Sequence, residues 1–226
     1  MTDGGSLRER LIDAGVELVL AGGSASVGLR ETARRAGVSH GAPRRYFPTH
    51  HALLSAVARR GFEDLGARFE AAVAAASTAR EQLEAVSRVY VEYALEHRGM
   101  FELMFRHDLL DSAAQAADQP RLRESALPLF GHITELVARC RAERNAGRHP
   151  DGPYENEPLP AVTAAALWSN LHGIAQLWAW GSLQLALEAP PLGDGPDDDQ
   201  RDDRRNDRRD RLIAAALDAH LGPVSS

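Results

Sequence analysis

The sequence has one cysteine and no long apolar run among its 226 residues. A single cysteine excludes an intramolecular disulfide framework and leaves no ligand set for a cysteine-based zinc or iron–sulfur site. Because no stretch of about 18 residues is uninterruptedly apolar, no membrane-spanning helix is predicted. The charged N-terminus is not followed by the apolar core and cleavage site of a secretory signal. These absences predict a cytoplasmic protein with no membrane partner.

Lysine is also absent, so all 26 basic residues are arginine. Nine arginines and five acidic residues lie in the first 60 positions, whereas the other 17 arginines share the rest of the chain with 27 acidic residues. The net charge of −6 therefore conceals a basic head on an acidic body. This pattern is expected if only the head contacts nucleic acid.

Apolar residues recur at helical spacing along most of the chain, and no convincing strand pattern occurs. We therefore predict an all-α protein. The first helix should begin at a capping box formed by Ser6 and Glu9, in which hydroxyl and carboxylate each bond a free backbone N–H. It should end at Gly22-Gly23, because glycine adopts left-handed backbone conformations without a Cβ penalty.

Two short helices are predicted next, over 29–36 and from about His40 to Phe47. Because proline lacks an N–H and fits only a first helical turn, Pro43 limits the second of these to a start near Ser39 or His40. Thr49 is expected to cap a long fourth helix. Three short helices, two of them joined by Ala-Gly-Val-Ser, are typical of a helix-turn-helix arrangement.

The remaining chain also has helical periodicity. Helices are predicted over about 83–93, 100–105, 120–144, 160–187 and 208–220. Residues 189–206 combine proline, glycine and aspartate with arginine, a composition that predicts a flexible linker.

Residues 29–54 read LRETARRAGVSHGAPRRYFPTHHALL. This stretch resembles the DNA-binding head of the tetracycline-repressor family, in which a short helix, Ala-Gly-Val-Ser, a glycine-containing recognition helix, aromatic-Phe and a capped helix follow one another. The similarity covers roughly residues 6–60. It implies a homodimeric transcriptional regulator, most often a repressor, that binds a palindromic operator in double-stranded DNA and is released by a small hydrophobic effector.

The resemblance implies the following organisation: a helix-turn-helix domain over 1–50, a connecting helix over 50–76, and a helical effector-binding and dimerisation domain over 77–226. In this docking mode the third helix enters the major groove. Its first residues, its central arginines, its tyrosine and the start of the fourth helix are the candidate DNA-binding residues: Ser39, His40, Gly41, Arg44, Arg45, Tyr46, Thr49 and His50.

Three positions depart from the family pattern. The family usually has a β-branched apolar residue at the position of Thr32, a tyrosine at that of Arg44 and a lysine at that of His50. Arg44 is a side chain that can bond guanine through two N–H groups. His50 lacks the fixed charge of lysine, although the N-terminus of its helix itself favours an anion.

Residues 167–181 read LWSNLHGIAQLWAWG and are similar to a C-terminal domain type of the same family that is marked by a Trp and a later His-Gly. Trp168 and His172 are four residues apart and share a helix face, and Gly173 would allow another helix to approach closely. One interpretation is core or dimer packing; the other makes His172 the polar group of an effector cavity. The candidate effector-binding residues are Tyr90, Tyr93, Met100, Met104, Phe105, Trp168 and His172.

Two helices are predicted to dimerise because their apolar faces exceed what a monomer's surface normally exposes. They lie over 160–187 and 208–220. The predicted face consists of Leu167, Leu171, Ile174, Trp178, Leu212, Ile213, Ala216 and Leu217.

Two other protein classes are alternatives to a regulator. An all-α enzyme would need a catalytic motif, and the sequence has no HExxH, nucleophile elbow or phosphate-binding glycine loop. An interaction module whose helix-turn-helix no longer binds DNA is supported only by the departures at Arg44 and His50. His107, Asp108 and Asp111 lack the second histidine pair that favours a metal site, and no cofactor is predicted. Cys140, next to two arginines, is either a redox-sensitive thiol or an incidental cysteine.

Overall fold

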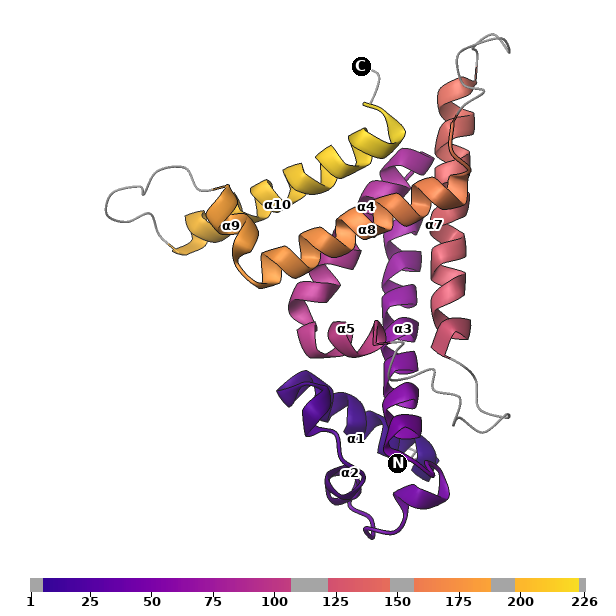
Figure 1. Cartoon of the computed structure of the whole chain (residues 1–226), viewed down its shortest axis with the longest axis vertical. Helices are drawn as coiled ribbons and strands as arrows, with labels where there is room; N and C mark the ends of the chain where they lie inside the picture. Colours follow the sequence, from indigo (N-terminus) through magenta and orange to yellow (C-terminus); the bar gives the residue numbers. More distant parts are fainter. Residues whose placement is uncertain (1–5, 107–121, 147–156, 188–197, 224–226) are drawn as a thin grey trace. The chain divides into compact units, whose positions relative to one another are not determined.

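The computed structural model describes residues 6–106, 122–146, 157–187 and 198–223 (Figure 1). Within these ranges the regular structure is entirely helical, which confirms the predicted all-α class. The chain divides into two compact units: residues 1–67 with 96–129, and residues 68–95 with 130–226.

The first unit contains α1 (Leu7–Gly22), η1 (Ser24–Ser26), α2 (Leu29–Arg35), η2 (Pro43–Arg45), α5 (Arg98–Met104) and most of α3 (His50–Ala74). Its core consists of apolar side chains from each of these α-helices, among them Leu11, Val19, Ala33, Leu53, Phe62 and Phe101. α5 lies directly against the end of α1, because a Cβ at Gly99 would lie 2.7 Å from the carbonyl oxygen of Val19.

The start of α1 agrees with half of the predicted capping box. The Ser6 hydroxyl accepts a hydrogen bond from the backbone N–H of Glu9 at 3.4 Å. The Glu9 carboxylate, however, bonds Arg8 and Arg60 through its two oxygens. It therefore ties α1 to α3.

The connection that follows α2 is a closed glycine turn. Gly37 has φ 68°, its N–H bonds the carbonyl of Arg34 at 3.2 Å, and the N–H of Val38 bonds the carbonyl of Ala33 at 2.9 Å. These are the two bonds of the Schellman motif, in which a left-handed residue ends a helix. The turn fixes the direction in which the chain leaves α2.

The prediction of a helix from about His40 to Phe47 is wrong, because the segment forms turns and one short 3-10 helix. A turn closed by Ser39 and Ala42 leads into a single 3-10 turn over Pro43–Arg45, in which the N–H of Tyr46 bonds the carbonyl of Pro43 at 3.0 Å. Pro43 has no backbone N–H, so it cannot donate the helical hydrogen bond to the carbonyl of Ser39, and the flexible Gly41 lies two residues upstream. An α-helix therefore does not propagate through this segment.

The second unit contains the end of α3, nearly all of α4 (Ala79–Glu96), most of α7 (Leu122–Asn145), α8 (Pro160–Ala179), α9 (Ser182–Ala186) and α10 (Asp198–Leu221). α10 packs along α8 (Figure 1). The core of this unit includes Leu83, Val86, Tyr90, Leu136, Leu167, Leu171, Trp178, Ile213 and Leu217.

Two further sequence predictions need correction here. The helix predicted over 160–187 is two helices, because Gly181 adopts φ 79° between α8 and α9. The flexible linker predicted over 189–206 is helical from Asp198 onward, and 189–197 lie outside the described residues. Aspartates near a helix N-terminus and i,i+4 pairs such as Asp207–Arg211, at 2.6 Å, favour a helix that apolar periodicity does not reveal.

Candidate functional site

Several arginines of the basic head are used inside the first unit. Arg10 donates to the carbonyl of Ala36 at 2.7 Å, Arg35 pairs with Glu17 at 2.6 Å, and Arg60 bridges Glu9 and Asp13. Arg34 pairs with Glu31 on the surface of α2. These bonds hold α1, α2 and α3 together, so the charge count of the head overstates the charge available to DNA.

Three arginines of the head are exposed and are not used in this way: Arg30, Arg44 and Arg45. Within the described part of the chain none of the three pairs with an acidic side chain. Arg44 and Arg45 project from η2, and Tyr46 follows them with 39% of its surface exposed. The predicted residues Ser39, His40 and Gly41 are exposed as well. The segment thus presents cationic and hydroxyl groups on the first unit.

Thr49 and His50 are positioned by local bonds. The Thr49 hydroxyl accepts from the N–H of Ala52 at 3.1 Å, as predicted for an N-cap. The His50 Nε2 donates to the carbonyl of Val27, which anchors the ring to the segment before α2. A neutral ring that donates through Nε2 has an acceptor at Nδ1. A phosphate contact through Nδ1 therefore requires a second proton on this histidine.

In the second unit, three polar side chains are linked by hydrogen bonds. Trp168 Nε1 donates to the Tyr90 hydroxyl oxygen at 2.9 Å, and that oxygen lies 2.8 Å from Nδ1 of His172. Because an indole can only donate, the Tyr90 oxygen accepts from Trp168. In the tautomer that carries its proton on Nε2, His172 accepts at Nδ1 and the Tyr90 hydroxyl donates to it. Burial raises the pKa of Tyr90 far above its ordinary value and lowers the pKa of His172, so both groups remain neutral at pH 7.

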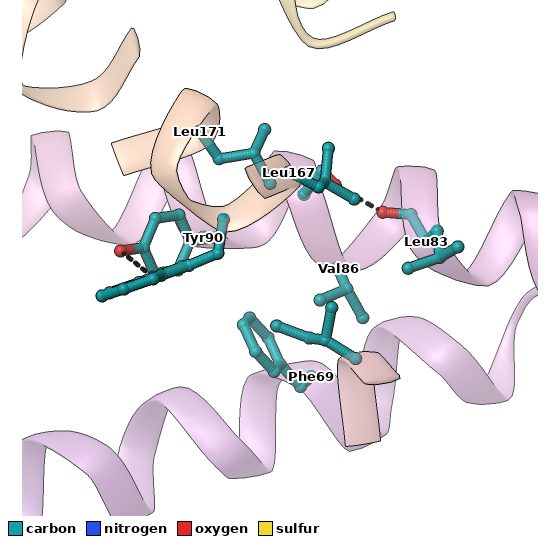
Figure 2. A pocket seen from close by; sticks show the side chains of 9 residues that line it. Phe69, Leu83, Val86, Tyr90, Leu167 and Leu171 are labelled. Atoms are coloured by element: carbon teal, nitrogen blue, oxygen red, sulfur yellow. Dashed lines mark hydrogen bonds between the residues drawn. The ribbon is translucent and has the colours of Figure 1, made fainter. Parts of the chain in front are cut away.

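An apolar cavity of about 10 Å³ lies beside this chain (Figure 2). A cavity of this size holds at most one water molecule. Figure 2 shows the side chains that α3, α4 and α8 contribute to its wall. Its lining consists of Phe69, Leu83, Val86, Ser87, Tyr90, Ile133, Leu167, Trp168 and Leu171.

The structure divides the predicted effector-binding residues between the two units. Tyr90, Trp168 and His172 come together, and Tyr93 is buried under the guanidinium of Arg68, which lies 5.1 Å from its ring centre. The other three, Met100, Met104 and Phe105, belong to the first unit.

Those three pack against α3. A Cβ on Gly61 would lie 2.7 Å from the Met104 sulfur and 2.9 Å from that of Met100, and Phe105 meets Phe62 edge-on at 5.7 Å. The missing glycine side chain makes room for both methionines. Sequence reasoning missed most of the cavity wall, although Leu83, Val86 and Tyr90 follow one another at helical spacing and could have been grouped with Trp168.

The predicted dimer face is largely buried inside the chain. Leu167, Leu171 and Trp178 of α8 pack in the second unit together with Ile213 and Leu217 of α10. A different stripe, on α8 and its C-cap Trp180, is open to solvent: Val162 is 55% exposed, Leu177 39% and Trp180 62%. A Cβ on Gly173 would meet nothing within 4 Å, so no helix of the described chain uses the close approach expected there.

The minor candidates receive no support. Burial raises the pKa of the half-buried Cys140, which favours the thiol over the reactive thiolate. His107, Asp108 and Asp111 lie outside the described residues. The described ranges contain no cluster of three side chains suited to a metal ion, and among them no helix has the length and apolarity to cross a membrane.

Residues 83–195 match the family described as "Tetracyclin repressor-like, C-terminal domain". The chain belongs to the tetracycline-repressor (TetR) family. The HTH-type transcriptional regulator BetI of Brucella melitensis is 30% identical over 165 residues, which cover 68% of this chain and 81% of that protein. The relatives of this TetR-family chain are transcriptional regulators rather than enzymes.

Solved structures agree with the TetR fold. A protein of unknown function from Rhodococcus sp. RHA1 has a TM-score of 0.70 and 28% identity, and the match covers 97% of this chain and 96% of that one. The regulator FadR from Bacillus subtilis, in complex with stearoyl-CoA, has a TM-score of 0.57 and 14% identity, with 96% and 99% covered. The second likeness shows the fold alone.

Proposed function

We propose that this transcriptional regulator is a cytoplasmic repressor that binds a palindromic operator as a homodimer and is released by a small hydrophobic effector. The observation that carries the DNA-binding part is the exposed pair Arg44 and Arg45 on η2. Arg34, Arg35 and Arg60 are paired with acidic side chains inside the first unit, whereas Arg44 and Arg45 lie beside Tyr46 with no acidic partner among the described residues. Arginine is the side chain that most often reads guanine in the major groove.

The test is an electrophoretic mobility shift against DNA from the chain's own upstream region, followed by a panel of single-base operator variants. Arg44→Ala is expected to weaken binding by about 1–3 kcal/mol and to remove the preference at one base pair. Tyr46→Phe, the comparison variant, should weaken binding to all operators alike if its hydroxyl bonds a phosphate. An equal loss across the panel for Arg44→Ala would overturn the base-reading role, and no shift with any upstream DNA would favour an interaction module.

The homodimer is supported by the solvent-exposed stripe on α8. Its residues lie on one face of the helix, because they follow one another at spacings of three, four and seven residues. They are Val162, Ala166, Gly173, Leu177 and the C-cap Trp180. The stripe combines large apolar side chains with a glycine that leaves room for a facing helix. An apolar stripe of this kind is expected at an interface between copies. Two heads would then read two half-sites about one helical turn of DNA, or a multiple, apart.

Effector release is supported by the cavity that adjoins Tyr90 and Trp168. A ligand that favours a dimer geometry mismatched to the operator must weaken DNA binding by the same coupling free energy by which DNA weakens ligand binding. Straight-chain alcohols of increasing length serve as test ligands. We expect the alcohols that raise the melting temperature also to lower operator affinity. Thermal stabilisation without any change in operator affinity would contradict this mechanism.

A further inference from the structure

His50 is an exposed side chain at the start of α3, and one of its two ring nitrogens is already engaged. Its Nε2 bonds the carbonyl oxygen of Val27. A carbonyl oxygen can only accept, so the proton of the neutral ring lies on Nε2 and the other nitrogen, Nδ1, is an acceptor. Among the described residues Nδ1 has no hydrogen-bond partner. The side chain therefore presents a lone pair that the protein itself does not use.

A DNA phosphate cannot bond this nitrogen in the neutral ring. A phosphodiester oxygen carries negative charge and only accepts hydrogen bonds, so it would meet Nδ1 lone pair against lone pair. A second proton on the ring makes Nδ1 a donor and gives the ring a positive charge, and hydrogen bonds between ionised groups are the strong ones. The bond from Nε2 to Val27 is present in both forms, because Nε2 carries its proton in both. Protonation thus converts a repulsive group into an attractive one without any movement of the ring.

The helix-turn-helix segment supplies no acidic partner for the second proton. Residues 23–28, which include the bonded carbonyl, have no ionisable side chain. The acidic side chains of α1 and α2 are each paired with an arginine: Glu9, Asp13, Glu17 and Glu31. The ring of His51 on the same helix lies 6.1 Å from that of His50, measured between their centres. The ionisable groups left on α2 and η2 are Arg30, Arg44, Arg45 and Tyr46. None of these is an anion at neutral pH, so the counter-charge for a protonated His50 has to come from a bound phosphate.

We propose that operator binding is coupled to protonation of His50, whose doubly protonated ring donates from Nδ1 to a backbone phosphate of the DNA. The inference rests on the proposed function, since it takes η2 and the start of α3 for the DNA-binding surface. DNA that binds the protonated form more tightly must raise the share of that form, and a lower pH must then strengthen DNA binding by the same coupling. An imidazole ordinarily titrates at about pH 6.5. The operator affinity therefore responds to pH in the physiological range.

The test is the affinity of the full-length protein for its operator at two pH values and constant ionic strength. Between about pH 8 and about pH 6 we expect the affinity to rise at least about tenfold for a complex with two heads. The salt dependence is measured at each pH. Every additional phosphate neutralised by the protein steepens the slope of log affinity against log salt by about 0.9, so the slope should be steeper at the lower pH. Equal salt slopes at the two pH values would overturn the proposal.

Two substitutions of His50 separate its charge from its structural bond. His50→Gln keeps an N–H for the Val27 carbonyl but does not titrate, and is expected to bind weakly at both pH values with one salt slope. His50→Lys carries a fixed charge, and is expected to bind at the higher pH about as tightly as the original chain binds at the lower pH. The second variant does not depend on the folding of the first. A purely structural role for His50 would move neither salt slope with pH.

His51→Gln is the matched control, because it removes an adjacent exposed histidine of the same helix. It should retain both the pH dependence and the change in salt slope. A pH dependence that survives His50→Gln, or that disappears with His51→Gln, would refute the coupling to His50 and leave the proposed DNA-binding function in place. If the original chain shifts no upstream DNA at either pH, DNA binding itself is refuted, and the coupling with it.

Discussion

Thr32 is fully buried in α2, and within the described part of the chain its hydroxyl oxygen has no hydrogen-bond partner. It stands where the family usually has an apolar β-branched residue. The methyl group of threonine fills the same space as part of valine, whereas its hydroxyl is removed from water without compensation. Such a group costs about 1–3 kcal/mol of folding free energy. The departure at this position therefore lowers the stability of the helix-turn-helix and leaves its shape intact.

Thr32→Val is expected to increase the free energy of unfolding by about 1 kcal/mol, because it removes an unsatisfied hydroxyl and keeps the side-chain volume. Urea titration followed by circular dichroism measures the change. Thr163→Val is the matched control: this threonine is also buried, but its hydroxyl accepts from Arg141. The control should lose stability, and a loss in both variants would contradict the account of Thr32.

His172 gives a prediction about pH. Burial holds its pKa in the folded protein below the ordinary value of 6.5 that applies to the unfolded chain. Between these two pKa values the unfolded chain binds more protons, so stability falls as the pH is lowered from 6.5 through the folded pKa. Above 6.5 both states are neutral and the effect is absent.

The measurement is the melting temperature between about pH 7.5 and about pH 5.5. His172→Asn retains an acceptor for the Tyr90 hydroxyl but does not titrate, and should flatten the acid side of the curve. His51→Asn, at an exposed position of α3, should leave the curve as it is in the original chain. A curve unchanged by His172→Asn would refute the contribution of this histidine.

At the scale of single elements, the turn after α2 depends on the left-handed conformation of Gly37. A Cβ there would meet nothing within 4 Å, so an alanine is opposed by the backbone alone. Gly37→Ala should lower the free energy of unfolding by about 1–2 kcal/mol and weaken operator binding, because the turn directs the chain toward η2.

Gly131 provides the control for that experiment. It lies inside α7, and a Cβ there also meets nothing within 4 Å. Gly131→Ala should therefore raise stability by up to about 1 kcal/mol, since alanine favours a helix interior more than glycine does. Urea titration of both variants checks the pair. Stability changes of the same sign would contradict the backbone explanation.

Local chemistry explains which elements could be predicted from the sequence. The Ser6 cap, the Gly37 turn and the Thr49 cap each depend on a side chain and its nearest backbone groups, and the structure has all three. The form of η2 was missed because Pro43 was judged only by where it allows a helix to begin. Its missing backbone N–H also matters, because position 43 cannot bond back to the carbonyl of Ser39 as an α-helix requires. The early start of α10 was missed because charge pairs, rather than apolar periodicity, mark that end.

At the scale of the whole molecule, the sequence identified apolar helix faces but not their partners. Leu167 and Leu171 line the cavity in the second unit, whereas Leu177 on the same helix faces solvent. Periodicity alone cannot separate these faces, because α8 is apolar around much of its circumference. The seven predicted effector-binding residues were divided between the two units for a similar reason: residue type suggested a pocket, but only packing decides which side chains meet.

The last prediction concerns assembly. If the exposed stripe of α8 joins two copies, Leu177→Arg places a charge in the interface, where it is desolvated without a partner, and the dimer should dissociate. Leu127→Arg is the control, because this leucine of α7 is exposed as well but lies outside the stripe. Sedimentation at micromolar concentration should show monomers for the first variant and dimers for the second. Since one head covers only one half-site, the monomer should also lose at least about tenfold in operator affinity. A Leu177→Arg protein that sediments as a dimer and binds the operator normally would show that the copies meet through another face.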